Sequence, residues 1–280
     1  MKTSKKYPEA IRILGIDVDN LSIVQANKAI EDIVGKSDKS THYVVKPYVD
    51  FMVKAQKDSN VKDILKNADL VLPDGVSLQW AASYLYGNPD KAFFKTLRSL
   101  LFWIQKPAWK SQILHESLGG PNQTIPLLKI AESNNWRVGI LGGKPDEIAT
   151  RRSNITKIFP GLESIYCWHG YFGSNDKEEL LDDIKNKKLD ILFVAMGFPR
   201  QEEFIYANRK ESLAKILIGE GGTFDYNQLG GSAKRAPKRI QKFGVEWLWR
   251  MAVQPKKIVR LYSVFKFIIL IKQSSREAKI

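Results

Sequence analysis

The sequence predicts an α/β protein with a largely parallel sheet wrapped by helices, and two observations support this. Short runs rich in β-branched residues recur along the chain, and stretches with helical spacing of apolar residues lie between them. The strand-like runs are 12–16, 42–46, 69–72, 137–141, 164–168, 190–195 and 215–219. The helical stretches include 123–133, 145–158, 176–186 and 201–211. This alternation is typical of a Rossmann-like sheet.

Composition narrows the class of protein. The chain has 280 residues, 44% of them hydrophobic, which suits one large domain, or one domain with an appendage. Cys167 is the single cysteine, so no intramolecular disulfide can form. The amino terminus lacks the apolar run of a signal peptide, and no window of 18 residues is apolar and uncharged. We therefore expect a cytoplasmic protein without a spanning helix.

The positive charge is concentrated near the carboxyl terminus. The net charge is +14, and residues 230–280 contain 13 Lys and Arg against Glu246 and Glu277, a local net charge of +11. A nearly neutral body with a basic tail indicates contact with an anionic surface, either lipid or nucleic acid.

Two stretches combine aromatic, apolar and basic residues, at 91–114 and 256–272. Each could be a core helix with a solvated basic face, but two of them beside a basic tail favour helices in a membrane interface. We expect an α/β core over 1–231, with 88–114 as a membrane-proximal insertion. Residues 232–280 are expected to form a basic, helical, amphipathic appendage that associates with membrane.

The loop after the run 69–72 contains one carboxylate, Asp74, between Pro73 and Gly75. Pro-Asp-Gly is common turn chemistry, so Asp74 can be a solvated turn residue. It can also be a catalytic base, because ligands of open α/β sheets bind at the carboxyl ends of the strands. The tripeptide alone leaves both interpretations open.

Three later strand-like runs are each followed by a glycine-bearing loop, in LGGKPDE (141–147), MGFPRQEEF (196–204) and GEGGTFDY (219–226). Each can be a turn with helix-capping residues. All three would lie along one edge of a parallel sheet, however, where backbone N–H groups at helix starts can bind phosphate. Neither LGGKPDE nor GEGGTFDY has the full G-x-G-x-x-G spacing, which disfavours a dinucleotide site.

The acidic run Asp17-Val18-Asp19 could hold a divalent metal or form a cap after the first strand, and the structural interpretation is favoured. His42, His115 and His169 have no spacing typical of a zinc site. The sequence therefore predicts no metal.

Four segments together resemble one family. They are PDG (73–75), LGGKP (141–145), MGFPRQEE (196–203) and the long block 221–257 that contains RAPKRIQKFGVEWLWR. They are similar to the WecG/TagA/CpsF glycosyltransferases, glycosyltransferase family 26, which includes N-acetylmannosaminyltransferases of teichoic acid and enterobacterial common antigen synthesis. The resemblance extends over roughly residues 10 to 262.

The resemblance implies an inverting transfer of a sugar from a UDP-sugar to a polyprenyl-diphosphate-linked saccharide at the cytoplasmic face of the membrane. The sugar would be N-acetylmannosamine, its uronic acid or a related hexose or uronic acid. The resemblance also implies that no metal or other cofactor is needed. Asp74 falls on the family's catalytic aspartate and Gln201 on an active-site glutamine. Asp74 would then accept the proton of the acceptor hydroxyl as that oxygen attacks the anomeric carbon.

The remaining predicted site residues form two groups. Expected substrate contacts are Lys46, Tyr48, Gly75, Asn122, Gly142, Gly143, Gly197, Pro199, Arg200, Glu202, Gly221, Gly222, Phe224 and Asp225. Expected contacts with diphosphate or membrane are Lys234, Arg235, Lys238, Arg239, Arg250, Lys256, Lys257 and Arg260.

The chain departs from the family's pattern in ways that leave the sugar open. Lys46-Pro47-Tyr48-Val49 stands where members commonly have Thr-x-Asn-Pro, and Ser83 stands where an arginine often follows the PDG helix. Lys46 could meet a carboxylate or a phosphate, or lie on the surface.

Two other functions are compatible with the sequence. One is a basic-tailed nucleic-acid-binding protein, although the Ile, Leu, Phe and Trp content of the tail suits lipid better. The other is a catalytically degenerate scaffold of the same family. We expect a UDP-sugar, a lipid-linked acceptor and an anionic membrane surface as partners, and no nucleic acid. A homo-oligomer is compatible with the sequence.

Overall fold

The computed structural model describes residues 10–37, 40–87, 113–237, 240–241, 246, 249 and 260–277. Its centre is a six-stranded sheet in the order β4-β3-β8-β7-β5-β6, in which every neighbouring pair is parallel. The strands are β3 (His42–Val45), β4 (Leu70–Val71), β5 (Val138–Gly142), β6 (Ile165–Trp168), β7 (Leu189–Ala195) and β8 (Ala214–Gly219). The predicted α/β class with a parallel sheet is confirmed.

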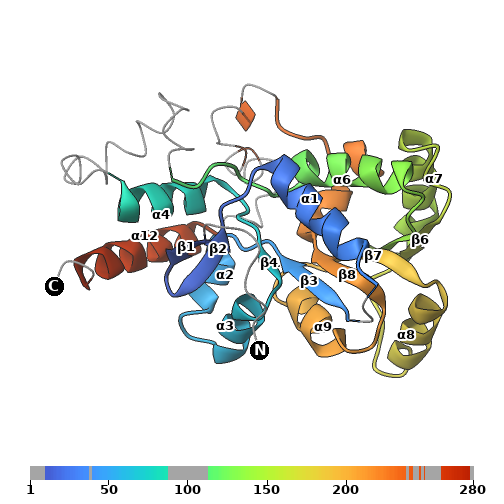
Figure 1. Ribbon diagram of the computed structural model, residues 1–280, viewed down its shortest axis with the longest axis horizontal. Helices are drawn as coiled ribbons and strands as arrows, with labels where there is room; N and C mark the ends of the chain where they lie inside the picture. The colour runs from blue at the N-terminus through green and yellow to red at the C-terminus, as the bar shows by residue number, and fades with distance from the viewer. Residues whose placement is uncertain are drawn as a thin grey trace.

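Helices cover both faces of this sheet (Figure 1). They are α1 (Ile23–Val34), α2 (Val49–Lys54), α3 (Ser59–Lys66), α4 (Val76–Tyr86), α6 (Pro121–Ser133), α7 (Ile148–Ile158), α8 (Lys177–Asn186), α9 (Arg200–Asn208) and α12 (Arg260–Glu277). Short 3₁₀ segments lie at Pro145–Glu147, Gly221–Asp225 and Asn227–Leu229. The four helical stretches expected at 123–133, 145–158, 176–186 and 201–211 correspond to α6, α7, α8 and α9.

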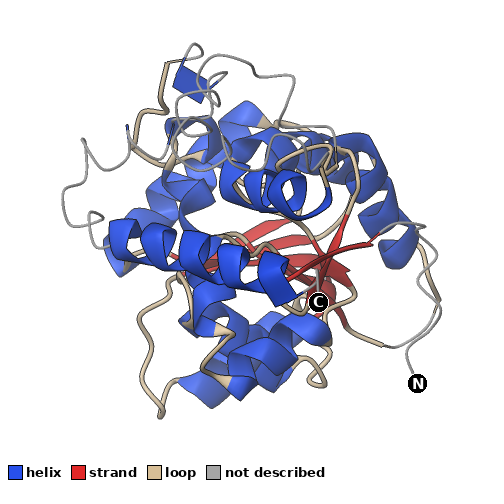
Figure 2. Ribbon diagram, turned by 90° about the vertical axis from the view of Figure 1, so that its left-hand side faces the viewer, coloured by secondary structure: helices blue, strands red, loops and turns tan. Residues whose placement is uncertain are grey.

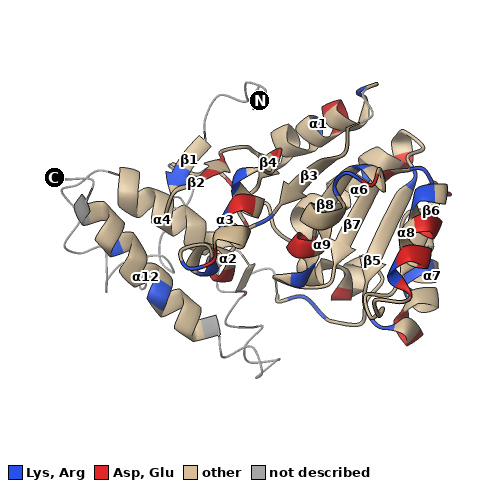
Figure 3. Ribbon diagram, turned by 90° about the horizontal axis from the view of Figure 1, so that it is seen from below, with Lys and Arg blue, Asp and Glu red and all other residues tan. Residues whose placement is uncertain are grey.

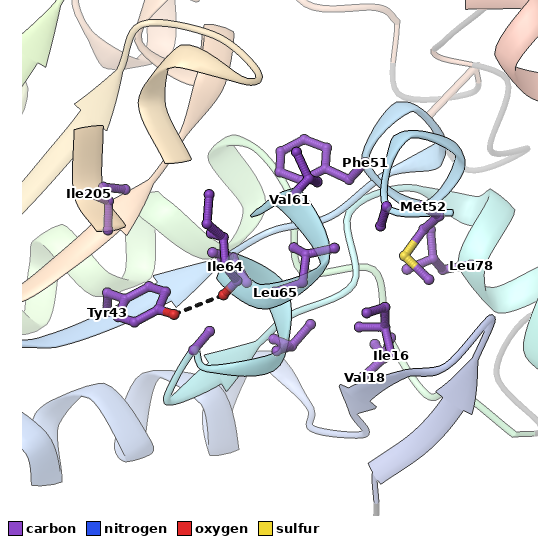
Figure 4. Close-up of a cluster of buried hydrophobic side chains, with 14 of the residues drawn as sticks. Ile16, Val18, Tyr43, Phe51, Met52, Val61, Ile64, Leu65, Leu78 and Ile205 are labelled. Atoms are coloured by element: carbon purple, nitrogen blue, oxygen red, sulfur yellow. Dashed lines mark hydrogen bonds between the residues drawn. The ribbon is translucent and has the colours of Figure 1, made fainter. Parts of the chain in front are cut away.

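The strands are apolar on both faces because each face is covered by helices. Successive strand residues point to opposite faces, so Val44 joins a core with α1, α6 and α7, while Val45 joins a core with α2, α3 and α9. Figure 4 shows part of the second core, where the Tyr43 hydroxyl donates a hydrogen bond of 2.8 Å to the Ile64 carbonyl. Burial raises the pKa of Tyr43. The two cores fix the sheet, and therefore the edge at which its strands end.

The first strand-like run, 12–16, was predicted to be one strand, and this prediction is wrong. The chain turns at Leu14 and Gly15, which both have positive φ, and forms an antiparallel pair, β1 (Ala10–Ile13) and β2 (Ile16–Asp19). This pair is a separate sheet. It lies against β4, where the Asp19 carboxylate accepts a hydrogen bond of 2.7 Å from the Val71 N–H.

The last described helix, α12, packs against α2 and α4 at the end of the molecule farthest from β6 (Figures 1 and 2). Phe267 and Ile271 on its inner side are fully buried in the core with α2 and α4. Its outer side carries Tyr262, Phe265 and Ile269, which are 68%, 63% and 54% exposed. Part of the predicted appendage therefore belongs to the packed core.

None of the helices within the described residues is long and apolar enough to cross a membrane. The stretch 91–114 lies outside the described residues except for its last two positions, and 256–259 also lies outside them. The predicted membrane contact of the first stretch therefore stays a prediction.

Candidate functional site

Five loops meet at the carboxyl edge of the sheet, because the strands are parallel and all end there. They follow β3 (46–48), β4 (72–75), β5 (142–144), β7 (196–199) and β8 (219–225). The chain leaves β5 toward β6 on one side and leaves β7 toward β8 on the other. Such a reversal between adjacent strands opens the crevice in which open α/β sheets bind ligands.

Asp74 is half-buried in this edge and is held by loops on two sides. Its backbone N–H donates to the Pro47 carbonyl at 2.9 Å, which joins the loops after β3 and β4. The N–H of the next residue, Gly75, donates to the Ser117 hydroxyl at 2.7 Å. The segment before α6 therefore lies over the loop that carries the carboxylate.

Gly119 lies directly against the Asp74 carboxylate. A Cβ atom built on Gly119 would come within 1.6 Å of Asp74 Oδ1. The backbone of residue 119 therefore sets how far the carboxylate can move, and only glycine permits this approach. The sequence analysis missed Gly119, because a contact between loops 45 positions apart leaves no local pattern.

Gly119→Ala is expected to displace the Asp74 carboxylate and to lower the turnover rate by at least about tenfold, since small misplacements of reacting groups are costly. Gly35→Ala is the control, because its added Cβ would meet the Glu31 carbonyl oxygen at 3.4 Å and lies outside the site. Initial rates and thermal melting of both variants check this. Parent-like turnover by Gly119→Ala would contradict this role of Gly119.

Lys46 is buried at the end of β3 and forms an ion pair with Glu220, which follows β8. Its ammonium group also donates to the Gln123 side chain in the first turn of α6. Thr124 donates to the same Glu220 oxygen at 2.8 Å, and Gln123 donates to the Asn27 side chain of α1 at 2.6 Å. The carboxylate that Lys46 meets therefore belongs to its own chain, and the network joins β3, β8, α6 and α1.

Gln201 connects the loops after β7 and β8. Its side-chain carbonyl accepts hydrogen bonds from the N–H groups of Gly197 at 3.1 Å and Gly221 at 2.9 Å. Its side-chain amide donates to Glu202 at 2.6 Å, and both side chains are buried. The structure therefore places Gln201 behind the loops, where it holds them together.

The Glu202 carboxyl group is buried beneath the end of β8, and a Cβ on Gly219 would be 3.0 Å from its Oε1 atom. Burial raises the pKa of Glu202 to about 8. Its second oxygen, Oε2, is buried and has no hydrogen-bond partner in the described part of the chain. The Glu202 carboxyl group is thus covered by protein, and this burial favours its protonated form.

Arg151 of α7 is also buried, beneath the loop after β5. It donates to the Gly142 carbonyl at 2.8 Å, and its guanidinium lies 3.7 Å from the Asp225 carboxylate. A Cβ on Gly143 would come within 2.5 Å of the guanidinium, so this loop needs glycine to pass over it. Sequence analysis missed Arg151, because an arginine among polar helix residues resembles a solvated one.

Several predicted substrate contacts pack against other side chains of the protein. The Tyr48 ring packs edge-on against Phe51, 4.9 Å away, and Phe224 lies in the core against Phe193. The Arg200 guanidinium lies over the Phe172 ring at 5.4 Å. Pro199 follows a cis peptide bond in the loop after β7, and Gly222 lies exposed in the loop after β8.

Arg235, at the start of the basic tail, lies beside the first turn of α6. It donates to the Asn122 side chain at 2.8 Å and pairs with Glu246 at 3.3 Å. Lys234 is exposed. Of the other predicted cations, Arg260 begins α12 with its side chain outside the described atoms, and the rest lie outside the described residues: Lys238, Arg239, Arg250, Lys256 and Lys257.

The acidic run near the amino terminus has protein partners. Asp17 pairs with Arg12 at 2.8 Å, and Asp19 accepts the bond from Val71 described above. Among the described residues, no group of three or more His, Cys, Asp and Glu side chains could hold a metal ion.

The carboxyl edge thus presents a half-buried carboxylate, Asp74, among loops that lead into helices. A carboxylate can accept a proton from a hydroxyl group that acts as a nucleophile. Helix starts and glycine loops can bind phosphate oxygens. These are the two parts that transfer of a group from a phosphate-activated donor to an alcohol requires.

Comparison with known proteins agrees with this chemistry. Residues 11–110 and 99–279 match the glycosyl transferase WecG/TagA/CpsF family. The chain is also similar to the N-acetylglucosaminyldiphosphoundecaprenol N-acetyl-beta-D-mannosaminyltransferase of Staphylococcus aureus strain NCTC 8325. The two are 25% identical over 269 residues, which is 96% of this chain and 94% of the relative. The protein of that name from strain MRSA252 has the same identity and coverage.

Proposed function

Because the chain belongs to the WecG/TagA/CpsF family of glycosyltransferases, we propose that it transfers a sugar from a UDP-sugar to a polyprenyl-diphosphate-linked saccharide. The observation that carries this proposal is the position of Asp74, half-buried at the carboxyl edge of the sheet and seated against Gly119. The family and the site thus support the same reaction class.

In the proposed step, Asp74 accepts the proton of the acceptor hydroxyl while that oxygen attacks the anomeric carbon of the donor. The bond from the anomeric carbon to the diphosphate breaks, and UDP leaves on the opposite face, so the configuration inverts. A positioned base of this kind contributes about 10²–10⁴-fold in rate. We propose that the helix starts beside the glycine loops and the cations of the basic tail stabilise the leaving diphosphate, without a metal.

The names of the relatives support N-acetylmannosamine as the sugar and a lipid-diphosphate N-acetylglucosamine as the acceptor. The Lys46 ion pair favours an uncharged sugar over a uronic acid. Its ammonium group already meets Glu220 and is buried, so it offers little charge to a second carboxylate.

The test is a screen of UDP-sugars with a short-chain lipid-diphosphate N-acetylglucosamine, in excess EDTA, with UDP release as the readout. Acceptor-dependent release with UDP-N-acetylmannosamine would support the proposal. A scaffold would release no UDP with any donor. Loss of the rate in EDTA, with recovery in Mg²⁺ or Mn²⁺, would overturn only the metal-free mechanism.

We also propose that the enzyme attaches peripherally to the cytoplasmic face of the membrane, through the outer side of α12. Tyr262, Phe265 and Ile269 are exposed there, and the described side chains of this helix include Lys266 and Lys272 and no acid (Figure 3). Cations near an anionic bilayer contribute about 1 kcal/mol each, and buried apolar side chains add to this.

Changing Tyr262, Phe265 and Ile269 together to serine is expected to weaken binding to anionic vesicles by at least about tenfold, since each buried apolar side chain contributes about 1.5–3 kcal/mol. Point changes are preferred to truncation because Phe267 and Ile271 of the same helix belong to the core. Co-sedimentation with vesicles measures the effect.

The matched control is Tyr171→Ser, at a tyrosine that is 64% exposed on another part of the protein. It should bind vesicles as the parent does. Equal binding by the triple variant and the parent would remove α12 from the membrane contact.

A further inference from the structure

Glu202 is a buried acid that the proposed transfer step does not use. It lies in the first turn of α9, is 2% exposed, and its Oε1 atom lies against Gly219 at the end of β8. No substrate can reach it without opening the protein. A buried carboxyl with one unpartnered oxygen is costly, so its position calls for a physical explanation.

The contact between Glu202 and Gln201 provides one. The Gln201 carbonyl accepts two backbone N–H groups, from Gly197 and Gly221, so the carboxamide must point its oxygen at the loops. If the amide turned over, its NH₂ group would face two donors. Glu202 Oε1 accepts from the Gln201 amide at 2.6 Å and therefore selects the orientation that holds both loops.

The surroundings of Glu202 favour its uncharged form. Burial disfavours the charged form, and no described Lys or Arg forms an ion pair with Glu202. The hydrogen bond from Gln201 and a backbone hydrogen bond lower the pKa of Glu202, and the neighbouring Glu203 charge raises it. Burial has the larger effect and raises that pKa to about 8.

The elements with the most contacts to α9 are β7, β8 and α3, and Tyr43 of β3 packs edge-on against Tyr206 of α9. The charged groups of these elements are paired or exposed, and His42 of β3 pairs with Asp69. Asp190 of β7 and Lys215 of β8 pair with each other at 2.9 Å, at the opposite end of β8 from Gly219. On α3, Asp63 and Lys66 are exposed and Lys62 lies near Gly15. None of these described charges is therefore placed to stabilise a Glu202 carboxylate.

We propose that Glu202 is a positioning residue that fixes the Gln201 carboxamide and, through it, the two glycine loops of the donor site. The catalytic importance of those loops rests on the proposed glycosyl transfer. The hydrogen-bonded connection from Glu202 to the loops does not depend on it.

Ionisation of Glu202 should disrupt this arrangement, because the cost of a buried anion without a cation outweighs the hydrogen bond from Gln201, which by itself favours the charged form. With a pKa of about 8 in the folded protein, the protonated fraction of Glu202 falls about tenfold between pH 7 and pH 9. Glu202→Gln keeps an oxygen that can accept from Gln201 and cannot ionise. Glu202→Leu removes the acceptor and leaves the Gln201 amide buried without a partner.

The same pKa predicts a change in stability. The carboxyl titrates near its ordinary value of 4.5 when unfolded and near 8 when folded, so the parent loses stability as the pH rises through that interval. Glu202→Gln should therefore gain stability relative to the parent between pH 5 and pH 8. This difference should disappear toward pH 4.

The experiment compares the parent, Glu202→Gln, Glu202→Leu and the control Glu179→Gln, whose side chain is exposed on α8. The first readout is the turnover rate from pH 6.5 to 9.5. The turnover rates of the parent and of the control should fall about tenfold between pH 7 and pH 9. The turnover rate of Glu202→Gln should fall much less. Glu202→Leu should turn over at least about tenfold more slowly at pH 7.

The second readout needs no activity. In protein labelled with ¹⁵N-glycine, amide exchange at Gly197 and Gly221 should accelerate in Glu202→Leu and, above pH 8, in the parent relative to Glu202→Gln. Gly139 inside β5 should be unaffected. If Glu202→Leu fails to fold, the proposal is still tested by the pH dependence of turnover and amide exchange in the parent and in Glu202→Gln.

The proposal is overturned if the turnover rate of Glu202→Gln falls at alkaline pH as that of the parent does. It is also overturned if the rates of amide exchange at Gly197 and Gly221 are equal in all variants. Absence of transfer by the parent would instead overturn the proposed function. The exchange comparison would then still test Glu202.

Discussion

Asp74→Asn is expected to lower the rate of transfer by about 10²–10⁴-fold, because an amide keeps the shape of the side chain and cannot accept the proton. Affinity for UDP should stay within a few fold of the parent, since Asp74 acts on the acceptor. The backbone bond from residue 74 to the Pro47 carbonyl does not involve the side chain and should persist. A large loss of turnover with retained UDP binding separates a chemical role from a structural one.

The matched control is Asp182→Asn, at a carboxylate 74% exposed on α8, which should transfer as the parent does. Single-turnover rates and UDP titrations of both variants provide the measurement. Transfer by Asp74→Asn at a rate near that of the parent would exclude Asp74 as the base.

Breaking the Lys46–Glu220 ion pair should have the largest effect on stability. Lys46→Met leaves the Glu220 carboxylate buried without its cation, and loss of one partner of a buried pair costs about 3–5 kcal/mol. Glu220→Leu should cost a similar amount, because it leaves the Lys46 ammonium group buried without its anion. The double variant should recover most of the loss, because apolar replacement of both partners is often neutral.

Urea denaturation of the three variants measures these free energies of unfolding. The control is Lys185→Met, which breaks the exposed pair with Glu211 at 3.0 Å and should cost at most about 1 kcal/mol. If the two single changes simply add in the double variant, the two residues do not act as a pair. The role of this network in joining β3, β8 and α6 would then be wrong.

The order of strands and helices could be predicted because parallel strands covered on both faces are apolar throughout and end in glycine or proline loops. Asp74 could be placed at the carboxyl edge because its strand and the following Pro-Asp-Gly are adjacent in sequence. The hairpin at residues 10–19 was missed, since Leu14 and Gly15 provide only a short turn signal within one apolar run.

The contacts that shape the site could not be predicted. Lys46 and Glu220 are 174 positions apart in the sequence, and Gly119 and Asp74 are 45 positions apart. No local sequence pattern therefore predicts either contact. Glu202 and Arg151 are charged residues on helices, where exposure is the usual expectation. Their burial results from the loops that cover them after folding.

The central claim is that this chain joins N-acetylmannosamine to a lipid-linked N-acetylglucosamine with Asp74 as the base. Its most direct test is mass spectrometry and NMR of the product formed from UDP-N-acetylmannosamine and a short-chain lipid-diphosphate N-acetylglucosamine. We predict a disaccharide with a β-linkage, made by the parent in excess EDTA and at most at trace levels by Asp74→Asn. An α-linked product, or no disaccharide from the parent with any UDP-sugar, would contradict the account.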